Sequence, residues 1–234
     1  MQLSKIQAYI EAFKQLLTTV RYQEEYKWEA LQNFQGNWDI TAIDFGAMYD
    51  QSFQSQVSRK LWNAPDYEPK RMMLKFIEME PEFVRSMFID LLDESRSIDA
   101  RMSRFVFYCD DLLQNYRKRN EQTRVNAHYH DDYQMVSLYL AFHFPEKYCL
   151  YHQGAFQQML QQLNARNVPL AHDLERFFKV VKTLNNFLQK DTDLIEAHQA
   201  IVQAEKFYQE ENLLLAHDFY WCCTQPEFKV KLDA

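Results

Sequence analysis

The chain has 234 residues, of which 47% are hydrophobic and 25% charged, so it is long enough to bury one substantial core. Glycine occurs only three times, which argues against a strand-rich fold, because such folds draw on glycine for their many tight turns. The formal net charge of 26 − 33 = −7 argues against a general nucleic-acid-binding surface, since phosphate contacts supply most of the affinity of such proteins.

The first half of the chain is predicted to be helical, because apolar residues recur there at three- and four-residue spacing. Ser4 and Gln7 form the pattern of a capping box in front of the first helix. Thr41-x-x-Asp44 opens a later helix, and prolines bracket a loop over residues 63–68. Helices are expected over residues 6–20, 23–35, 44–53, 70–79, 81–92 and 98–116.

Residues 117–127 are the most polar stretch of the second half and are predicted to form a loop. The run Met135–Phe142 is apolar on nearly every face, and its length, with Asp131 and Asp132 before it, favours a buried helix over a buried strand. Residues 147–151 are the best candidate for a short extended segment. Further helices are expected over residues 156–163, 170–188, 194–208 and 212–222.

These patterns predict an all-α fold, an irregular multi-helix orthogonal bundle that forms a single domain over residues 1–234. A joint between two lobes would fall at residues 117–127. The four cysteines form no C-x-x-C pair, which favours a reduced, cytoplasmic setting. The N-terminal residues lack a signal-peptide pattern, and the most apolar stretch is about half the length of a membrane span, so no membrane association is expected.

No complete catalytic or nucleotide-binding motif is present. The sequence contains no G-x-x-x-x-G-K-[ST], no G-x-S-x-G, no H-E-x-x-H and no cysteine pair at zinc-ligand spacing. We therefore expect no cofactor, no bound metal and no enzymatic activity of this domain by itself.

The segment 128–132 holds two histidines and two aspartates in the order His-Tyr-His-Asp-Asp. With distant ligands such as His143 or His152, it could hold a metal ion, as in His-Asp phosphohydrolases. The simpler interpretation is that the aspartates cap the following helix and that the histidines bond to neighbouring backbone. His198 lies on the apolar face of its helix and is expected to be a core histidine with its hydrogen bonds satisfied.

An Arg-x-x-x-x-x-His spacing, which resembles the motif of HEPN ribonucleases, occurs at Arg124 to His130 and at Arg166 to His172. In those enzymes the pair activates a ribose hydroxyl and steadies the phosphate. This function is the less favoured one, because Arg124 precedes a valine rather than a polar residue and lies in a predicted loop.

Basic residues concentrate at one place in the chain, at 117–119 and 124. They would contact phosphate from an exposed loop, or they would complement the dipole at a solvated helix C-terminus. Together with two neighbouring residues they form the candidate binding surface: Arg117, Lys118, Arg119, Arg124, Tyr129 and His130.

Five segments spread over most of the chain form a further pattern: Phe34–Ile40, Met87–Ser95, His128–Phe142, Pro145–Tyr148 and Leu215–Phe219. In this order and spacing they resemble the N-terminal region of McrB-type AAA+ restriction proteins, particularly the bacterial branch with helical N-termini. The resemblance implies a module that works with a nucleotide-hydrolysing AAA+ core, in cis or in trans, and with an McrC-type nuclease in phage defence.

In the best understood proteins of this group, the N-terminal module reads modified cytosine in DNA. Those readers flip the base into an aromatic pocket on a mostly β or mixed fold, from which this helical, acidic chain departs. The leading expectation is a non-catalytic recognition or adaptor module of such a system, with a specificity surface that engages DNA or a partner protein. The alternative is a protein–protein docking scaffold, and a HEPN-like ribonuclease or a metal-dependent phosphohydrolase is less favoured.

Overall fold

The regular secondary structure of the described residues is entirely helical. The computed structural model describes residues 1–19, 22–55, 57–62 and 64–225, and within these ranges it contains eleven α-helices, one 3-10 helix and no strand. The predicted all-α, irregular multi-helix bundle is confirmed. Val20 and Asn63, predicted to end the first helix and to open a loop, lie outside the described residues.

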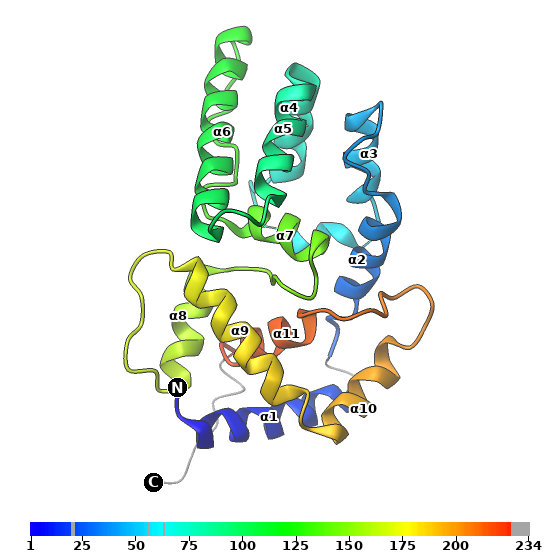
Figure 1. The fold of residues 1–234 in the computed structure, drawn as a ribbon, viewed down its shortest axis with the longest axis vertical. Helices are drawn as coiled ribbons and strands as arrows, with labels where there is room; N and C mark the ends of the chain where they lie inside the picture. Colours follow the sequence, from blue (N-terminus) through cyan, green and yellow to red (C-terminus); the bar gives the residue numbers. More distant parts are fainter. Residues whose placement is uncertain (20–21, 56, 63, 226–234) are drawn as a thin grey trace.

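The helices form two groups, one above the other in the view of Figure 1. The upper group consists of α2 (Tyr26–Asn37), α3 (Phe45–Ser52), the 3-10 helix η1 (Ser58–Trp62), α4 (Pro69–Met79), α5 (Pro81–Leu92), α6 (Ile98–Arg119) and α7 (Gln134–His143). The lower group consists of α1 (Leu3–Leu17), α8 (Gln153–Gln162), α9 (Leu174–Leu188), α10 (Thr192–Val202) and α11 (Leu214–Cys222).

One hydrophobic core runs through both groups. The first helix belongs with the end of the chain, because α1 packs against α10 and α11 (Figure 1). The two groups also meet where α6 contacts α9. The described residues therefore share a single core, in which the first helix packs against the last two. The two groups do not correspond to an N-terminal and a C-terminal half of the chain.

Helix α7 lies at the base of the upper group and is the most buried element. Every residue from Met135 to Phe142 is buried, as the unbroken apolar run predicts. Asp132 accepts a hydrogen bond from the backbone N–H of Gln134 at 2.9 Å, so one of the two predicted aspartates caps this helix. The N-cap residue itself, Tyr133, has a left-handed backbone with a φ of 62°.

Several predicted helix ends are wrong. Helix α1 begins at Leu3, with Gln2 as N-cap and no side-chain cap, so Ser4 is not a capping residue. The N–H of Gln2 bonds instead to the carbonyl of Leu163 at 2.8 Å, and this long-range contact replaces the predicted box. Asp44 does cap α3, accepting from the N–H of Ala47 at 2.9 Å. Helices α2, α9 and α10 also begin or end several residues from their predicted limits.

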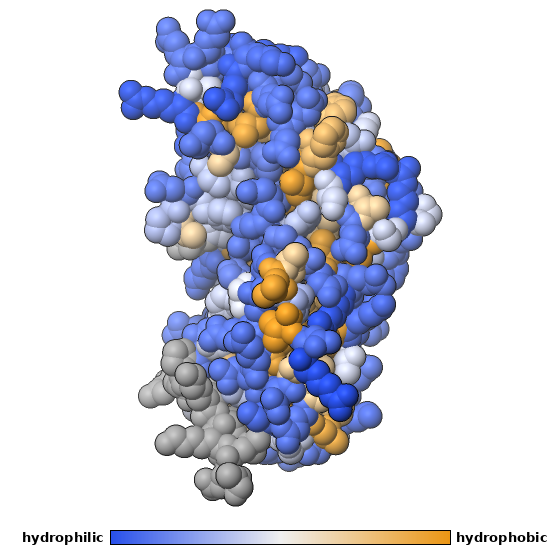
Figure 2. All heavy atoms as spheres, turned by 90° about the vertical axis from the view of Figure 1, so that its left-hand side faces the viewer, coloured by the Kyte–Doolittle hydropathy of each residue, from blue (hydrophilic) through white to orange (hydrophobic). Residues whose placement is uncertain are grey.

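The predicted loop over residues 117–127 is wrong in its first part. Helix α6 continues to Arg119, and the chain then returns along α6, since His128 bonds to Asp110 of that helix. Residues 148–152 lie outside the helices and form no strand with any described residue. Polar side chains cover most of the face of the molecule seen in Figure 2, and apolar side chains lie in small groups between them.

Candidate functional site

A pocket of about 410 Å³ lies where α2, η1, α7 and α11 meet, and we call it the junction pocket. The segment of residues 150–152, which connects α7 to α8, closes one side. Its volume lies in the range of small-molecule sites. Aromatic side chains dominate the lining: Tyr26, Trp62, Tyr67, Tyr151, Tyr220 and Trp221.

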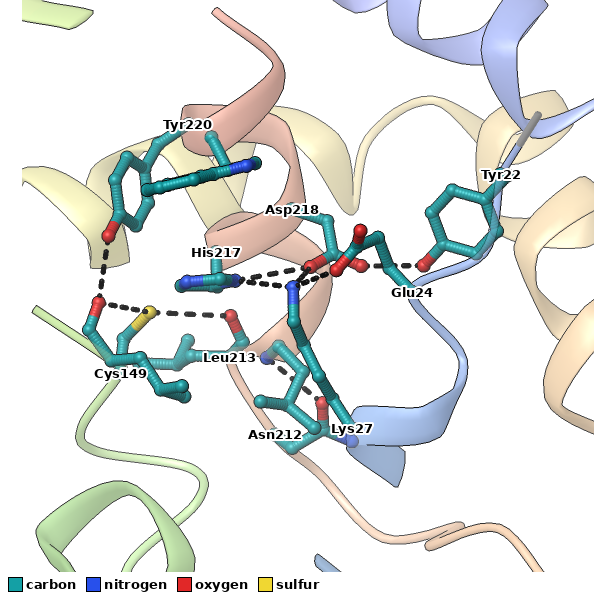
Figure 3. A network of polar contacts seen from close by, with 12 residues as sticks. Tyr22, Glu24, Lys27, Cys149, Asn212, Leu213, His217, Asp218 and Tyr220 are labelled. Atoms are coloured by element: carbon teal, nitrogen blue, oxygen red, sulfur yellow. Dashed lines mark hydrogen bonds and ion pairs between the residues drawn. The ribbon is translucent and has the colours of Figure 1, made fainter. Parts of the chain in front are cut away.

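A buried ion cluster forms the inner wall of the junction pocket (Figure 3). Lys27 of α2 is 3% exposed, and its Nζ lies 2.5 Å from Oδ1 of Asp218 and 2.6 Å from Oε2 of Glu24. The third ammonium donor reaches Nδ1 of His217 at 3.0 Å. Tyr22 donates a hydrogen bond of 2.6 Å to Oδ2 of Asp218. All donors of the ammonium are therefore satisfied within the protein.

The cluster fixes the protonation of its members. Burial alone would lower the pKa of Lys27, but the carboxylates of Asp218 and Glu24 raise it above its ordinary value. Lys27 in turn keeps the pKa of Asp218 below its ordinary value, although burial opposes this. The pKa of His217 is lowered by burial and by the neighbouring ammonium, so this imidazole is neutral near pH 7.

The neutral ring of His217 presents its Nε2 to the pocket. Nδ1 lies 3.0 Å from Nζ of Lys27, which can only donate, and 3.1 Å from Oδ1 of Asp218, which can only accept. Nε2 therefore carries the ring proton if Nδ1 accepts from Lys27, and a lone pair if Nδ1 donates to Asp218. Among the described residues, no hydrogen-bond partner of this Nε2 is found, and the side chain lines the pocket. A ligand in the junction pocket would meet this ring nitrogen at one wall and the carboxylate of Asp132, an acceptor, at another.

A second depression of about 930 Å³ adjoins the first, and we call it the loop groove. Trp62 and Tyr67 line both cavities, so η1 and the loop after it form the wall between them. Helix η1 contains two cationic residues: Arg59 lines the loop groove and Lys60 lines the junction pocket. Both are exposed, and neither forms an ion pair with any described residue, although Lys60 lies over the ring of Tyr26 at 5.0 Å.

The predicted basic residues lie elsewhere. Arg117, Lys118 and Arg119 occupy the last turn of α6, at the end remote from the lower group (Figure 1). Their position matches the helix C-terminus interpretation, in which cations complement the helix dipole. Arg119 also pairs with Glu80 and donates to the carbonyl of Met79. Arg124 is exposed in the segment that follows.

The other two predicted residues separate from this patch. Tyr129 is half-buried, packs against Tyr67 with ring centroids 5.6 Å apart, and lines the loop groove. Its φ of 63° is a left-handed conformation that costs a tyrosine about 1 kcal/mol or more. His130 is fully buried and contacts Phe105, about 18 Å along α6 from Arg117 by the helical rise. The six predicted residues therefore do not form one surface.

The histidines of segment 128–132 bond as the simpler interpretation predicts. Nδ1 of His128 accepts from the N–H of His130 at 3.0 Å, and its Nε2 lies 3.1 Å from Asp110. Nδ1 of His130 contacts the carbonyl of His128 at 2.5 Å, and its Nε2 contacts the hydroxyl of Tyr139 at 3.0 Å. Both rings are thus held by internal hydrogen bonds.

These two histidines and Cys109 have potential metal-ligating atoms within 4.8 Å of one another. His143 and His152, the distant ligands considered for a phosphohydrolase, are not part of this group. A neutral His128 that accepts at Nδ1 carries its proton on Nε2, so neither nitrogen offers a free lone pair. The hydrogen bonds therefore favour a structural role for the cluster.

The first HEPN-like pair does not form a site. Arg124 is exposed, whereas His130 is buried and bonded to Tyr139, so the two side chains do not face the same solvent-filled space. In the second pair, Nδ1 of His172 contacts the hydroxyl of Tyr151 at 3.1 Å, and Arg166 is exposed.

Sequence reasoning missed the residues that form the junction pocket. Lys27 and Asp218 are separated by 191 positions, and nothing local to either marks it as buried. The only signal was indirect, since His217 and Asp218 lie in the segment Leu215–Phe219 that carries part of the McrB resemblance.

Comparison of the chain with protein-family models, with curated proteins and with solved structures finds no match. No helix within the described ranges combines the length and the apolar character that a bilayer span requires. The site is therefore interpreted from its own chemistry.

Proposed function

We propose that this chain is the non-catalytic recognition module of a cytoplasmic McrB-type AAA+ restriction system, and that it contacts DNA at the junction pocket and the loop groove. The observation that carries the proposal is an aromatic pocket beside two cations, Arg59 and Lys60, that have no ion pair among the described residues. The restriction system, and its AAA+ core and McrC-type nuclease as partners, are inferred from the resemblance of the sequence.

The chemistry of the pocket suits an extruded nucleobase. Aromatic side chains stack on any base, and a flipped base is further read by hydrogen bonds to its edge. His217 offers a ring nitrogen and Asp132 an acceptor, and a carboxylate is a suitable partner for the exocyclic amine of cytosine. Arg59 and Lys60 would contact the phosphates on either side of the extruded nucleotide.

The acidic net charge is consistent with this mode of binding. A protein that encloses one nucleotide needs a few local cations, not a basic surface along the duplex. Binding would then depend on salt less steeply than that of a protein with a basic surface along the duplex, and it would depend strongly on the identity of the extruded base. This module would recognise DNA by a pocket, and the basic end of α6 would contribute little.

Protein docking is the second candidate. Phe83 and Phe107, on α5 and α6, are 37% and 66% exposed, and both rings pack beside Tyr108. An exposed aromatic group of this kind is common at interfaces. Apolar docking at this site would be insensitive to salt, whereas the DNA complex would weaken as phosphate contacts are screened.

Substitutions in η1 test the DNA site. Trp62→Ala is expected to weaken binding of a duplex carrying a modified cytosine about 5- to 100-fold, because one stacked base contributes about 1–3 kcal/mol. Lys60→Glu should weaken binding of all duplexes and reduce the salt slope by about one. Fluorescence anisotropy with labelled duplexes, modified and unmodified, at two salt concentrations measures both effects.

Lys118→Glu is the matched control, since Lys118 is an exposed cation of α6 without an ion pair among the described residues. Unchanged binding by Trp62→Ala and Lys60→Glu, with loss in Lys118→Glu or Arg119→Glu, would move the site to the end of α6. No binding to any DNA would favour the docking function. Circular dichroism and the melting temperature of each variant exclude loss of folding as the cause.

A further inference from the structure

A third cavity, of about 310 Å³, lies between the first turn of α6 and the outer face of α9. It shares no lining residue with the junction pocket or the loop groove. Its lining is rich in cations, with Arg96 and Arg101 at the start of α6 and Lys179 and Lys182 on α9. We call it the α6–α9 cavity.

Arg101 is the unusual member of this group. Its side chain is 4% exposed, yet it has no ion pair with any described carboxylate. A guanidinium has five N–H donors, and two contacts are found, to the carbonyl of Leu91 at 3.0 Å and to the hydroxyl of Tyr148. Its Nε is buried without a partner. A buried cation in this condition is costly unless an anion compensates it.

The acidic groups of the cavity are already engaged. Glu94 contacts Lys147 and accepts from the hydroxyl of Tyr148 at 3.0 Å. Glu175 pairs with Lys179 at 2.6 Å. Lys182, in contrast, has no ion pair within the described part of the chain. Arg96 pairs with Asp90 and Asp93, so Arg101 and Lys182 are the two lining cations without an ion pair in the described part of the chain, although the charges of Asp93 and Glu94 act on Arg101 through space.

The backbone at the start of α6 adds to the positive electrostatic potential of the cavity. Helix α6 has 22 residues, and Ser97 at its N-cap and Ile98 in its first turn both line the cavity. Free N–H groups and the positive end of the dipole favour an anion at this point. The Ser97 hydroxyl accepts from Ala100 at 3.4 Å, which leaves the N–H groups of Ile98 and Asp99 without a partner among the described residues.

We propose that the α6–α9 cavity binds the phosphate group of a small phosphomonoester. The planar fork of Arg101 suits two phosphate oxygens, and Lys182 and the first turn of α6 would neutralise the remaining charge. The volume accommodates a phosphate with a short substituent. Because both helix groups line the cavity, the bound anion joins α6 to α9 and stabilises the arrangement of the two groups.

Isothermal titration calorimetry with inorganic phosphate and with glycerol 3-phosphate, in chloride buffer of constant ionic strength, tests the proposal. The wild-type chain is expected to bind both, and Lys182→Glu to bind both at least tenfold more weakly. Arg101→Lys, which keeps the charge and loses the fork, should also weaken binding. Arg101 is buried, so Arg101→Lys could fail to fold for reasons unrelated to phosphate. In that case Lys182→Glu, at an exposed position, decides the test.

Lys118→Glu and Trp62→Ala serve as controls, and both should bind phosphate as the wild type does. Equal binding by Lys182→Glu and wild type would overturn the proposal. So would the absence of any phosphate effect beyond that of chloride. If the chain binds inorganic phosphate but does not bind glycerol 3-phosphate, a phosphomonoester is excluded as the ligand.

Discussion

A Lys27→Met variant is expected to lose about 3–5 kcal/mol of unfolding free energy, the usual effect of removing one partner of a buried ion pair. The side chain of Lys27 is 3% exposed and that of Asp218 is 0% exposed, so the substitution leaves a carboxylate that water does not reach. The remaining partners of this carboxylate are Tyr22, which donates one hydrogen bond, and Nδ1 of His217 at 3.1 Å, and neither replaces the charge of the ammonium. Urea denaturation at pH 7 measures the loss.

The double variant Lys27→Met/Asp218→Leu distinguishes charge from packing. Replacing both members by apolar residues removes the uncompensated charge, so the double variant should be more stable than Lys27→Met alone. Lys14→Met is the matched control: Lys14 pairs with Asp191 at 2.9 Å, but the two side chains are 21% and 19% exposed. Its loss should be about 1 kcal/mol or less. Equal losses in Lys27→Met and Lys14→Met would show that the cluster contributes no more than a surface pair.

The ion cluster around Lys27 contributes both to the stability of the fold and to the shape of the junction pocket. Lys27 lies in the first turn of α2 and Glu24 lies just before that helix, whereas His217 and Asp218 come from α11 of the other helix group. The ion pairs therefore hold two walls of the pocket together and hold the ring of His217 between Lys27 and Asp218. A variant such as Lys27→Met should lose any ligand of the pocket even at temperatures where it remains folded.

Much of the fold could be predicted because it depends on local pattern. The run Met135–Phe142 is apolar at every turn, and its burial in α7 follows directly. Pro69 and Pro81 each occupy the first turn of a helix, where a missing N–H costs nothing. In these elements the local sequence and the tertiary contacts favour the same structure.

The wrong boundaries have a common cause. Residues 117–119 are entirely polar, so no apolar periodicity marks them as helical, yet their cations suit the C-terminal end of α6. The start of α1 depends on a backbone contact between Gln2 and Leu163, which no local pattern reveals. The short helix η1 has too few residues to show any period, although it carries two of the proposed contact residues, Arg59 and Lys60.

The candidate sites could not be predicted for a different reason. Lys27, Asp218 and Arg101 are residue types that are rarely buried, so sequence reasoning places them at the surface by default. Their burial follows from contacts between helices of the two groups, which lie far apart in the sequence. The polar segment 128–132 is easier to notice in the sequence than these residues, but its two histidines bond to each other's backbone groups.

Acid is expected to unfold this protein at a higher pH than carboxylate protonation alone would require. Burial lowers the pKa of His130 from 6.5 to about 3 and that of His198 from 6.5 to about 4. The unfolded chain takes up a proton at each residue near pH 6.5, whereas the folded chain does not. Stability is therefore complete above pH 6.5 and falls as the pH decreases toward 4.

The size of this effect follows from the shifts. At pH 4 each histidine should cost about 3 kcal/mol, and at pH 5.5 about 1 kcal/mol. Together they approach the whole stability of a typical domain, about 5–15 kcal/mol. Urea midpoints at pH 7, 5.5 and 4.5 should therefore decline steeply before most carboxylates titrate.

His198→Phe isolates one of the two groups. The ring of His198 packs on Trp28 with centroids 4.7 Å apart, and its Nε2 is buried without a partner, contrary to the expectation of a satisfied core histidine. A phenyl ring keeps the contact and removes both the unpaired nitrogen and the titrating group, so this variant should be as stable as wild type at pH 7 and more stable at pH 5. His172→Gln, at an exposed position, should change the pH dependence much less. An unchanged pH dependence in His198→Phe would contradict this prediction, because it would mean that His198 takes up its proton at the same pH in the folded and the unfolded chain, and that the charge of Asp218 offsets the effect of burial.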